Sequence, residues 1–250
     1  MNQLLNKLKQ NDYDRYITST FIEKDKIADI LKLLEFNIEI ASIKNRITET
    51  MMGNIRFAWW REAIEEIFDE NKKPRNHIIV NHIKELQSKY KLDKDGFLSL
   101  INAREKDLSE TPFEKVSDFF EYINDTSFKL NKIILDIITT ELPDEQIITA
   151  IKNYSNAWAV AAILFSANKN FSRGRNIFPV ELCQKYGLKA EDYGSKEFIS
   201  TSKNIVKELV ETALAMNNNN KIIKIENPLK AKLKPLLTYK KLANYRLQQI

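Results

Sequence analysis

The spacing of apolar side chains after Asp25 restricts the fold more than any other feature of this sequence. These residues stand three or four positions apart: Ile27, Ile30, Leu31, Leu34, Ile38 and Ala41. An α-helix completes a turn every ~3.6 residues, so these side chains share one face. The spacing predicts a helix with one buried face, and a second helix is expected from about Met52 to Asp69.

The residues that build tight turns in β-sheets are scarce. The chain of 250 residues has five glycines and six prolines, and its β-branched residues do not alternate over any long run. This composition favours an all-α protein. Because there is no internal repeat and no linker rich in Pro, Gly or Ser, we expect one domain over residues 1–250.

Further helices are expected along the rest of the chain. Thr111 can cap a helix and Pro112 suits its first position, so a long helix is predicted from Phe113 to Thr140. Pro143 gives the same signal for a helix from Asp144 to about Asn168. The remaining helices are expected at 77–90, 97–108, 179–187, 196–216 and from Pro228 onward, with a polar break at 217–220.

Charge and cysteine content restrict the setting of the protein. The net charge of +5 permits contact with phosphates or an anionic membrane surface without requiring either. One cysteine, Cys183, cannot form an internal disulfide, so a reducing compartment is expected. The first residues lack the pattern of a secretory signal, and no apolar window of about 18 residues is present. These features predict a cytoplasmic protein that can lie peripherally on an inner membrane.

Most familiar catalytic motifs are missing. His77 and His82 are not spaced as metal ligands, no glycine-rich phosphate loop occurs, and Cys183 is interpreted as a small core residue. Carboxylate pairs that could hold Mg²⁺ occur four residues apart on helices. These pairs, which we interpret as solvated surface residues, are Glu35/Glu39, Glu62/Glu66 and Glu110/Glu114.

Two basic regions are candidate anion sites. Arg173 and Arg175 flank Gly174 in a loop, where two guanidinium groups can close on an anion, although a solvated loop is an equal alternative. Residues 224–246 contain seven cations and one acid, with leucines between them. This stretch suits an anionic membrane or an acidic partner, but a core helix with a lysine-rich outer face is favoured. No nucleic-acid-binding motif accompanies the charge.

A set of ordered motifs resembles the squalene/phytoene synthase superfamily. The matching pieces are Tyr13–Tyr16, Thr18–Phe21, Leu34–Asn37, Arg56–Glu62 with the paired Trp59 and Trp60, Ala103–Leu108, Tyr122 and Arg173–Pro179. The resemblance covers about residues 12–187 in order and spacing. It implies the all-α isoprenoid synthase fold, in which helices surround an apolar cavity. Two aspartate-rich motifs at its mouth bind Mg²⁺, which holds and ionises prenyl diphosphates.

The sequence departs from the family at these two motifs. The first falls on Ala41, Ser42, Ile43, Lys44, Asn45 and Arg46, and the second on Ser166 and Asn170. None of these residues is a carboxylate, and a cluster of Mg²⁺ ions needs anionic oxygen ligands. We therefore expect no catalytic residue, no bound metal and no other cofactor.

The sequence also resembles the branch of the superfamily that includes the mitochondrial assembly factor of respiratory complex I. This resemblance implies a non-catalytic protein that assists assembly of that complex, with its subunits or the membrane surface as partners. A prenyl lipid or diphosphate is a further expected ligand. Trp59, Trp60 and Tyr122 would lie near the cavity, and Arg56, Arg173 and Arg175 toward its mouth.

Two alternatives remain open. The first is a Mg²⁺-dependent head-to-head prenyl transferase acting on farnesyl or geranylgeranyl diphosphate, with carboxylates drawn from Glu35, Glu39 and Asp107. The second is a scaffold on a membrane surface or nucleic acid that uses the basic tail.

Overall fold

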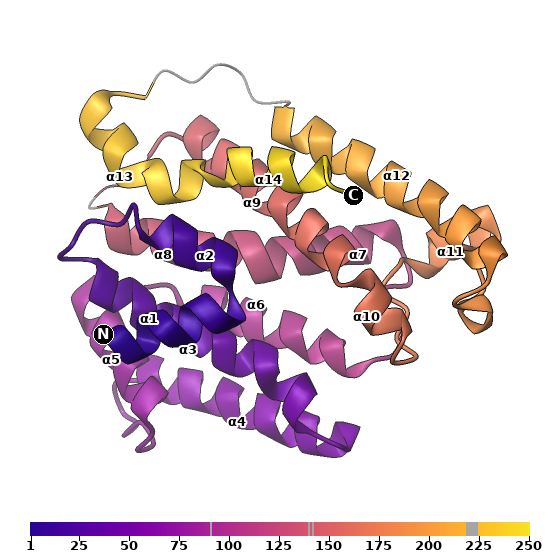
Figure 1. Ribbon diagram of the computed structural model, residues 1–250. Helices are drawn as coiled ribbons and strands as arrows, with labels where there is room; N and C mark the ends of the chain where they lie inside the picture. Colours follow the sequence, from indigo (N-terminus) through magenta and orange to yellow (C-terminus); the bar gives the residue numbers. More distant parts are fainter. Residues whose placement is uncertain (91, 140, 142, 219–224) are drawn as a thin grey trace. The chain divides into compact units, whose positions relative to one another are not determined.

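The computed structural model describes residues 1–250 except 91, 140, 142 and 219–224 (Figure 1). The described residues form helices and turns, without a β-strand. The predicted all-α class is therefore confirmed. The helices gather into two compact units, each built from separate stretches of the chain. The expectation of one domain over residues 1–250 stays a prediction.

The first unit contains Met1–Leu108, Lys129–Asp144 and Lys224–Thr238. Its helices are α1 (Asn2–Asn11), α2 (Tyr13–Ser19), α3 (Ile27–Ser42), α4 (Thr50–Phe68), α5 (Ile78–Tyr90), α6 (Lys94–Glu105), α8 (Lys129–Ile138) and α13 (Asn227–Leu237). Leu233 and Leu236 of α13 are buried, whereas Lys230 and Lys234 are exposed. This part of the basic tail is therefore a core helix with lysines outside, and Lys224 lies outside the described residues.

Helix α3 is the centre of the first unit. It packs against α1, α5, α6 and α8, and Ile30, Leu33 and Phe36 have no exposed surface. The apolar spacing after Asp25 is confirmed, since α3 begins at Ile27 and ends at Ser42. Neighbours on several sides also bury polar positions, because a helix surrounded by others retains little solvent-facing surface.

The second unit contains Ser109–Phe128, Glu145–Ile223 and Tyr239–Ile250. Its helices are α7 (Val116–Ile123), α9 (Glu145–Phe165), α10 (Ala167–Phe171), α11 (Val180–Tyr186), α12 (Lys196–Asn218) and α14 (Tyr239–Leu247). Helix α9 is central, and α12 and α14 both pack along it (Figure 1). The rings of Trp158 on α9 and Tyr239 on α14 meet edge to face, 5.1 Å apart.

The predicted long helix from Phe113 to Thr140 is wrong at its start. Helix α7 begins at Val116, because Lys115 is extended and the Asp118 carboxylate accepts a hydrogen bond from its N–H at 3.0 Å. A π-helical turn, Asn124–Phe128, then leads into α8. Thr140, the expected end, lies outside the described residues, as do two asparagines of the expected polar break, 219 and 220.

Helix α9 begins near its expected position but ends at Phe165 rather than near Asn168. The short helix α10 follows it, with Ser166 between the two. Helices α11 and α12 lie close to the ranges expected from sequence.

Candidate functional site

The first degenerate motif lies at the end of α3 and in a 3-10 turn, Ile43–Arg46, within the first unit. The Ser42 hydroxyl donates to the Glu39 carbonyl oxygen at 2.8 Å. Arg46 Nη1 donates to Glu39 Oε2, also at 2.8 Å. The cation in the motif therefore neutralises the carboxylate that precedes the motif on α3.

The other positions of this motif present few oxygen ligands. Lys44 Nζ donates to the Leu108 carbonyl oxygen at 3.4 Å, at the end of the 3-10 turn Lys106–Leu108. Asn45 is exposed, and Ala41 is half-buried. Among these positions, only the Ser42 hydroxyl and the Asn45 amide carry side-chain oxygen.

The three carboxylates considered for metal binding all have cationic partners. Glu35 Oε1 accepts from Lys7 Nζ at 3.1 Å, and Glu35 Oε2 lies 3.2 Å from His82 Nδ1. Asp107 Oδ2 lies 3.5 Å from Arg104 Nη1. The expectation that Glu35 and Glu39 face solvent is wrong, since their side chains are only 13% and 21% exposed. Packing of α1 and α5 beside α3, which one helix's periodicity does not reveal, covers Glu35.

The paired tryptophans of α4 belong to an aromatic cluster. The Trp60 ring lies edge to face with the Phe36 ring at 5.4 Å and is buried, while Trp59 is half-buried. The His77 ring lies 5.4 Å from both indole rings. Arg56, expected near the mouth of a cavity, is exposed.

Arg75, in the loop after α4, contacts this aromatic cluster and a carboxylate of α4. Its guanidinium lies 4.8 Å from the Trp59 ring centroid, and its Nε donates to Glu66 Oε2 at 2.9 Å. These hydrogen bonds from Arg75 lower the pKa of Glu66 to about 2. Arg75 also pairs with Glu62 at 3.2 Å. The Glu62/Glu66 pair is thus held by Arg75 rather than merely solvated, whereas Glu110 and Glu114 are exposed as expected.

The second degenerate motif runs from Ser166, between α9 and α10, to Asn170 within α10, in the second unit. Asn170 Nδ2 donates to the Ser166 carbonyl oxygen at 2.9 Å and contacts Ser166 Oγ at 3.0 Å. Arg175 Nη1 donates to Asn170 Oδ1 at 3.3 Å, and Arg175 Nε donates to the Ser109 carbonyl oxygen at 3.2 Å. Ser166, Asn170 and Arg175 therefore form one network.

The loop that carries the two arginines is fixed by its backbone. Gly174 has a positive φ of 73°, and the N–H of Arg175 donates to the Asn170 carbonyl oxygen at 3.0 Å. The turn directs Arg175 into the network, while Arg173 is exposed. Of the two arginines, only Arg173 has the solvent-exposed position that a solvated loop would give.

Tyr122 and Cys183 are buried in the second unit. The Tyr122 ring is 5% exposed and lies 5.1 Å from the Phe113 ring. Burial raises the pKa of the Cys183 thiol, and Asn176 Nδ2 lies 3.5 Å from its sulfur. The interpretation of Cys183 as a core residue agrees with this position. The roles expected of Tyr122 and the tryptophans around a cavity stay predictions.

The residues at the motif positions do not fit Mg²⁺, the ion implied by the resemblance. Mg²⁺ takes carboxylate, phosphate and water oxygens, whereas these positions present cations, amides, hydroxyls and methyl groups. Within the part of the chain that is described, no three His, Cys, Asp or Glu residues are grouped so that they could hold a metal ion. No described helix is both long and apolar enough to cross a membrane.

The Glu39–Arg46 pair and the Asn170–Arg175 bond were not foreseen. Glu39 and Arg46 stand seven residues apart, a spacing that would place them on one face of a continuous α-helix, but α3 ends at Ser42 and Arg46 lies in the 3-10 turn. The Asn170–Arg175 bond depends on the turn at Gly174 and carries no comparable sequence signal. The expectation that the two degenerate motifs face one another across a cavity stays a prediction.

The chain is similar in sequence to several known proteins. The bovine NADH dehydrogenase (ubiquinone) complex I, assembly factor 6, is 22% identical over 209 residues, which are 84% of this chain and 62% of that protein. The human protein of the same name is 21% identical over 209 residues, with the same coverage, and the Dictyostelium discoideum homolog is 23% identical over 217 residues, 85% of this chain and 59% of that one. The chain thus spans about three-fifths of the length of these relatives.

Solved structures show the fold. Squalene synthase HpnC from Alicyclobacillus acidocaldarius superposes with a TM-score of 0.79 at 16% identity, over 99% of this chain and 92% of that one. A dehydrosqualene synthase in complex with ligand superposes with a TM-score of 0.71 at 15% identity, over 99% of this chain and 86% of that one. The predicted isoprenoid synthase fold is therefore confirmed. The model of the squalene/phytoene synthase family matches residues 8–222, and the chain belongs to that family.

Proposed function

We propose that this chain is a non-catalytic member of the squalene/phytoene synthase family that assists assembly of respiratory complex I. The observation that carries the proposal is the chemistry of the two motif segments. Arg46 stands where the family resemblance places a metal-binding carboxylate, and it is bonded to Glu39, while Lys44 lies between two such positions. Asn170 occupies the second motif and accepts from Arg175.

Electrostatics explains why these substitutions oppose prenyl transfer. Mg²⁺ must balance its charge with anionic ligands while it holds a diphosphate. An arginine at one of these positions and a lysine between them repel the ion. They attract a diphosphate but supply no metal to stabilise it as it leaves. Binding of a prenyl lipid or diphosphate is compatible with this arrangement. Release of diphosphate from a prenyl diphosphate is not.

The assembly role is supported by the relatives. Proteins from cattle, humans and Dictyostelium discoideum that are named complex I assembly factor 6, or its homolog, align with 84–85% of this chain. We infer that subunits of respiratory complex I are the partners. The proposed location is the cytoplasm, with peripheral contact at the inner membrane where the complex is assembled.

The first experiment titrates the purified protein with farnesyl diphosphate, with and without Mg²⁺, and analyses the products. We expect no diphosphate release and no head-to-head product under either condition. A squalene synthase assayed in parallel is the positive control. Metal-dependent release of diphosphate would overturn the non-catalytic assignment and support the prenyl transferase alternative.

The second experiment tests the partner. Deletion of the chain in its host is expected to lower NADH:quinone oxidoreductase activity and the amount of assembled complex. The chain re-expressed with Arg46→Ala is expected to restore both. Unchanged complex I levels after deletion would contradict the assembly role, whatever the result of the enzyme assay.

A further inference from the structure

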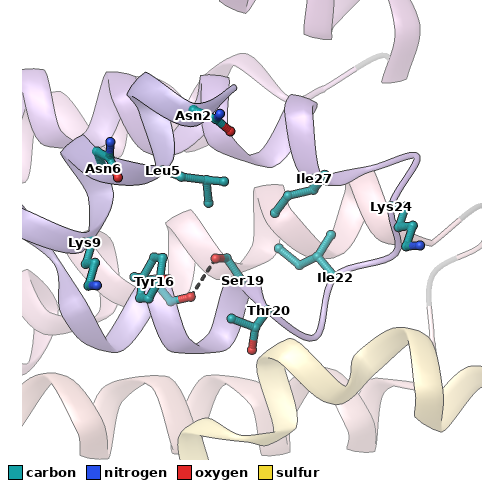
Figure 2. A pocket seen from close by; sticks show the side chains of 10 residues that line it. All are labelled: Asn2, Leu5, Asn6, Lys9, Tyr16, Ser19, Thr20, Ile22, Lys24 and Ile27. Atoms are coloured by element: carbon teal, nitrogen blue, oxygen red, sulfur yellow. Dashed lines mark hydrogen bonds between the residues drawn. The ribbon is translucent and has the colours of Figure 1, made fainter.

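A pocket of about 520 Å³ lies among α1, α2 and the segment leading into α3, all within the first unit (Figure 2). Small-molecule sites in proteins commonly have volumes of about 300–1,000 Å³. Asn2, Leu5 and Asn6 of its lining precede residue 8, where the match to the family model begins. The pocket is therefore formed in part by residues outside the matched span.

One side of the pocket is apolar. Leu5 from α1, Ile22 from the connecting segment and Ile27 from the start of α3 are directed into the space between these elements (Figure 2). All three side chains are half-buried. They form a surface that a short hydrocarbon body can cover, and this contact would remove apolar area from water.

The charged groups of the lining are both cations. Lys9 and Lys24 line the pocket, which contains no aspartate or glutamate in its lining. Both lysines are exposed, and neither forms an ion pair with a residue described by the structure. Lys9 Nζ lies 5.6 Å from the centroid of the Tyr16 ring, another part of the lining.

Two carboxylates of the same unit and one hydroxyl of the lining are bonded to other groups. Asp12 pairs with Arg15, and Glu35 pairs with Lys7, so those carboxylates are neutralised by other cations. The Ser19 hydroxyl donates to the Tyr16 carbonyl oxygen at 2.7 Å, shown as the dashed line in Figure 2. The pocket thus has a lysine at each of its two ends, with the apolar side chains between them (Figure 2).

We propose that this pocket binds a small amphipathic anion, a molecule with one acidic head group and a short hydrocarbon body. The head group accepts hydrogen bonds from Lys9 or Lys24, and the body packs on Leu5, Ile22 and Ile27. Charge-assisted hydrogen bonds to an anion are about twice as strong as neutral ones, so the charge gives the site its selectivity. This site does not depend on the proposed assembly function.

The test uses sodium decanoate at monomeric concentrations and, in a separate arm, vesicles of phosphatidylglycerol or phosphatidylcholine. Calorimetry on the full chain measures the affinity for decanoate, and flotation measures vesicle binding. Decanoate binding at one site identifies a free anion as the ligand. Binding to phosphatidylglycerol vesicles alone identifies the lipid of a membrane.

Variants decide whether either signal comes from the pocket. The double variant Lys9→Gln/Lys24→Gln is expected to weaken binding about tenfold or more. Lys73→Gln/Lys84→Gln, which removes two exposed charges elsewhere on the same unit, is expected to leave it unchanged. Asn6→Trp, at an exposed position of α1, fills the pocket and is expected to weaken binding without lowering the melting temperature.

Three outcomes would overturn the proposal. One is the absence of binding to decanoate and to both kinds of vesicle. Another is equal affinity for decanol and decanoate, because the lysines would then contribute nothing. The third is a loss of binding that is the same in the pocket and control double variants, which would show a diffuse effect of net charge.

Discussion

Arg46 and Glu39 are joined by a 2.8 Å hydrogen bond that ties the 3-10 turn after α3 back to that helix. Arg46 is 45% exposed, so solvent screens most of the attraction. We predict that Arg46→Ala lowers the free energy of unfolding by less than about 1 kcal/mol. Urea denaturation measures this, with Lys73→Ala as the exposed control. A loss of unfolding free energy above ~2 kcal/mol would contradict this prediction and show that Arg46 is important for stability.

Asp29 is predicted to matter much more for stability. Its carboxylate is 5% exposed and accepts from Lys89 Nζ and Tyr90 Oη, both at 2.6 Å, which connects α3 to α5. Asp29→Asn is expected to cost about 1.5–3 kcal/mol, because hydrogen bonds to a buried charge are stronger than neutral ones. Lys89 is half-exposed, so Lys89→Ala is expected to cost less. An Asp29→Asn variant as stable as the parent would contradict this prediction.

The lowered pKa of Asp29 predicts that its contribution to stability depends on pH. Burial alone would raise the pKa of Asp29, but the hydrogen bonds from Lys89 and Tyr90 and the charges of Lys89 and Lys32 outweigh it, so the pKa is lowered. A lowered pKa stabilises the fold above the unfolded value of about 3.9, and this contribution disappears as the pH falls through the folded pKa. The stability difference between parent and Asp29→Asn is therefore expected to be constant above about pH 5 and to shrink below it. A difference that persists unchanged into strong acid would refute the linkage.

Arg75 provides a spectroscopic prediction. Its hydrogen bonds hold the pKa of Glu66 at about 2, and its guanidinium lies over the Trp59 ring. Arg75→Ala is expected to return the pKa of Glu66 toward its ordinary value of about 4.3 and to change tryptophan fluorescence. Carbon-13 NMR titration of the carboxyl group measures the first effect. Lys73→Ala should alter neither signal, and an unchanged Glu66 pKa in Arg75→Ala would show that another group sets it.

The helical spacing of the sequence predicted α3 well because burial of one apolar face is a local pattern. The same spacing wrongly predicted that Glu35 and Glu39 face solvent, because their environment depends on α1, on α5 and on Arg46. The prediction that α7 begins at Phe113 failed for a related reason. Thr111 and Pro112 form a reasonable local start signal, but the Val116 N–H donates to Glu181 Oε2 at 2.9 Å, a partner 65 residues away. Tertiary contacts of this kind override local propensity.

The ordered motifs of the sequence place the two degenerate segments at Ala41–Arg46 and at Ser166 with Asn170, and this placement stays a prediction. Their hydrogen bonds did not follow, because an asparagine can donate and accept in several directions. The pocket beside α1 was not predicted at all, since Leu5, Ile22 and Ile27 come together only when α1 folds against α2.

The network at the second motif gives a prediction about the two arginines. Arg175 donates to Asn170 Oδ1 and to the Ser109 carbonyl oxygen, whereas Arg173 is exposed. Arg175→Ala is expected to cost about 1–2 kcal/mol, and Arg173→Ala less than about 0.5 kcal/mol. A double-mutant cycle with Asn170→Ala should show coupling to Arg175 and none to Arg173. Equal costs for the two arginines would contradict the network.

Replacement of Gly53 on α4 is predicted to destabilise the protein for steric reasons. A Cβ at this position would lie 2.6 Å from Leu108 Cδ2 and 2.7 Å from Ile47 Cδ1, closer than real Cβ contacts. Alanine has the higher helix propensity, by about 1 kcal/mol, but relief of the clash requires movement of packed side chains. We therefore expect Gly53→Ala to lower the free energy of unfolding by about 1–3 kcal/mol.

Gly96 on α6 is the matched comparison for this prediction. A Cβ there would lie 3.3 Å from Ile133 Cδ1, so a shift of a few tenths of an ångström at the end of one side chain relieves the contact. The helix propensity of alanine then offsets most of the cost, and Gly96→Ala is expected to change stability by less than about 1 kcal/mol. Urea denaturation of both variants measures the contrast. If Gly53→Ala were no less stable than Gly96→Ala, α4 would not approach Leu108 as closely as the structure places it.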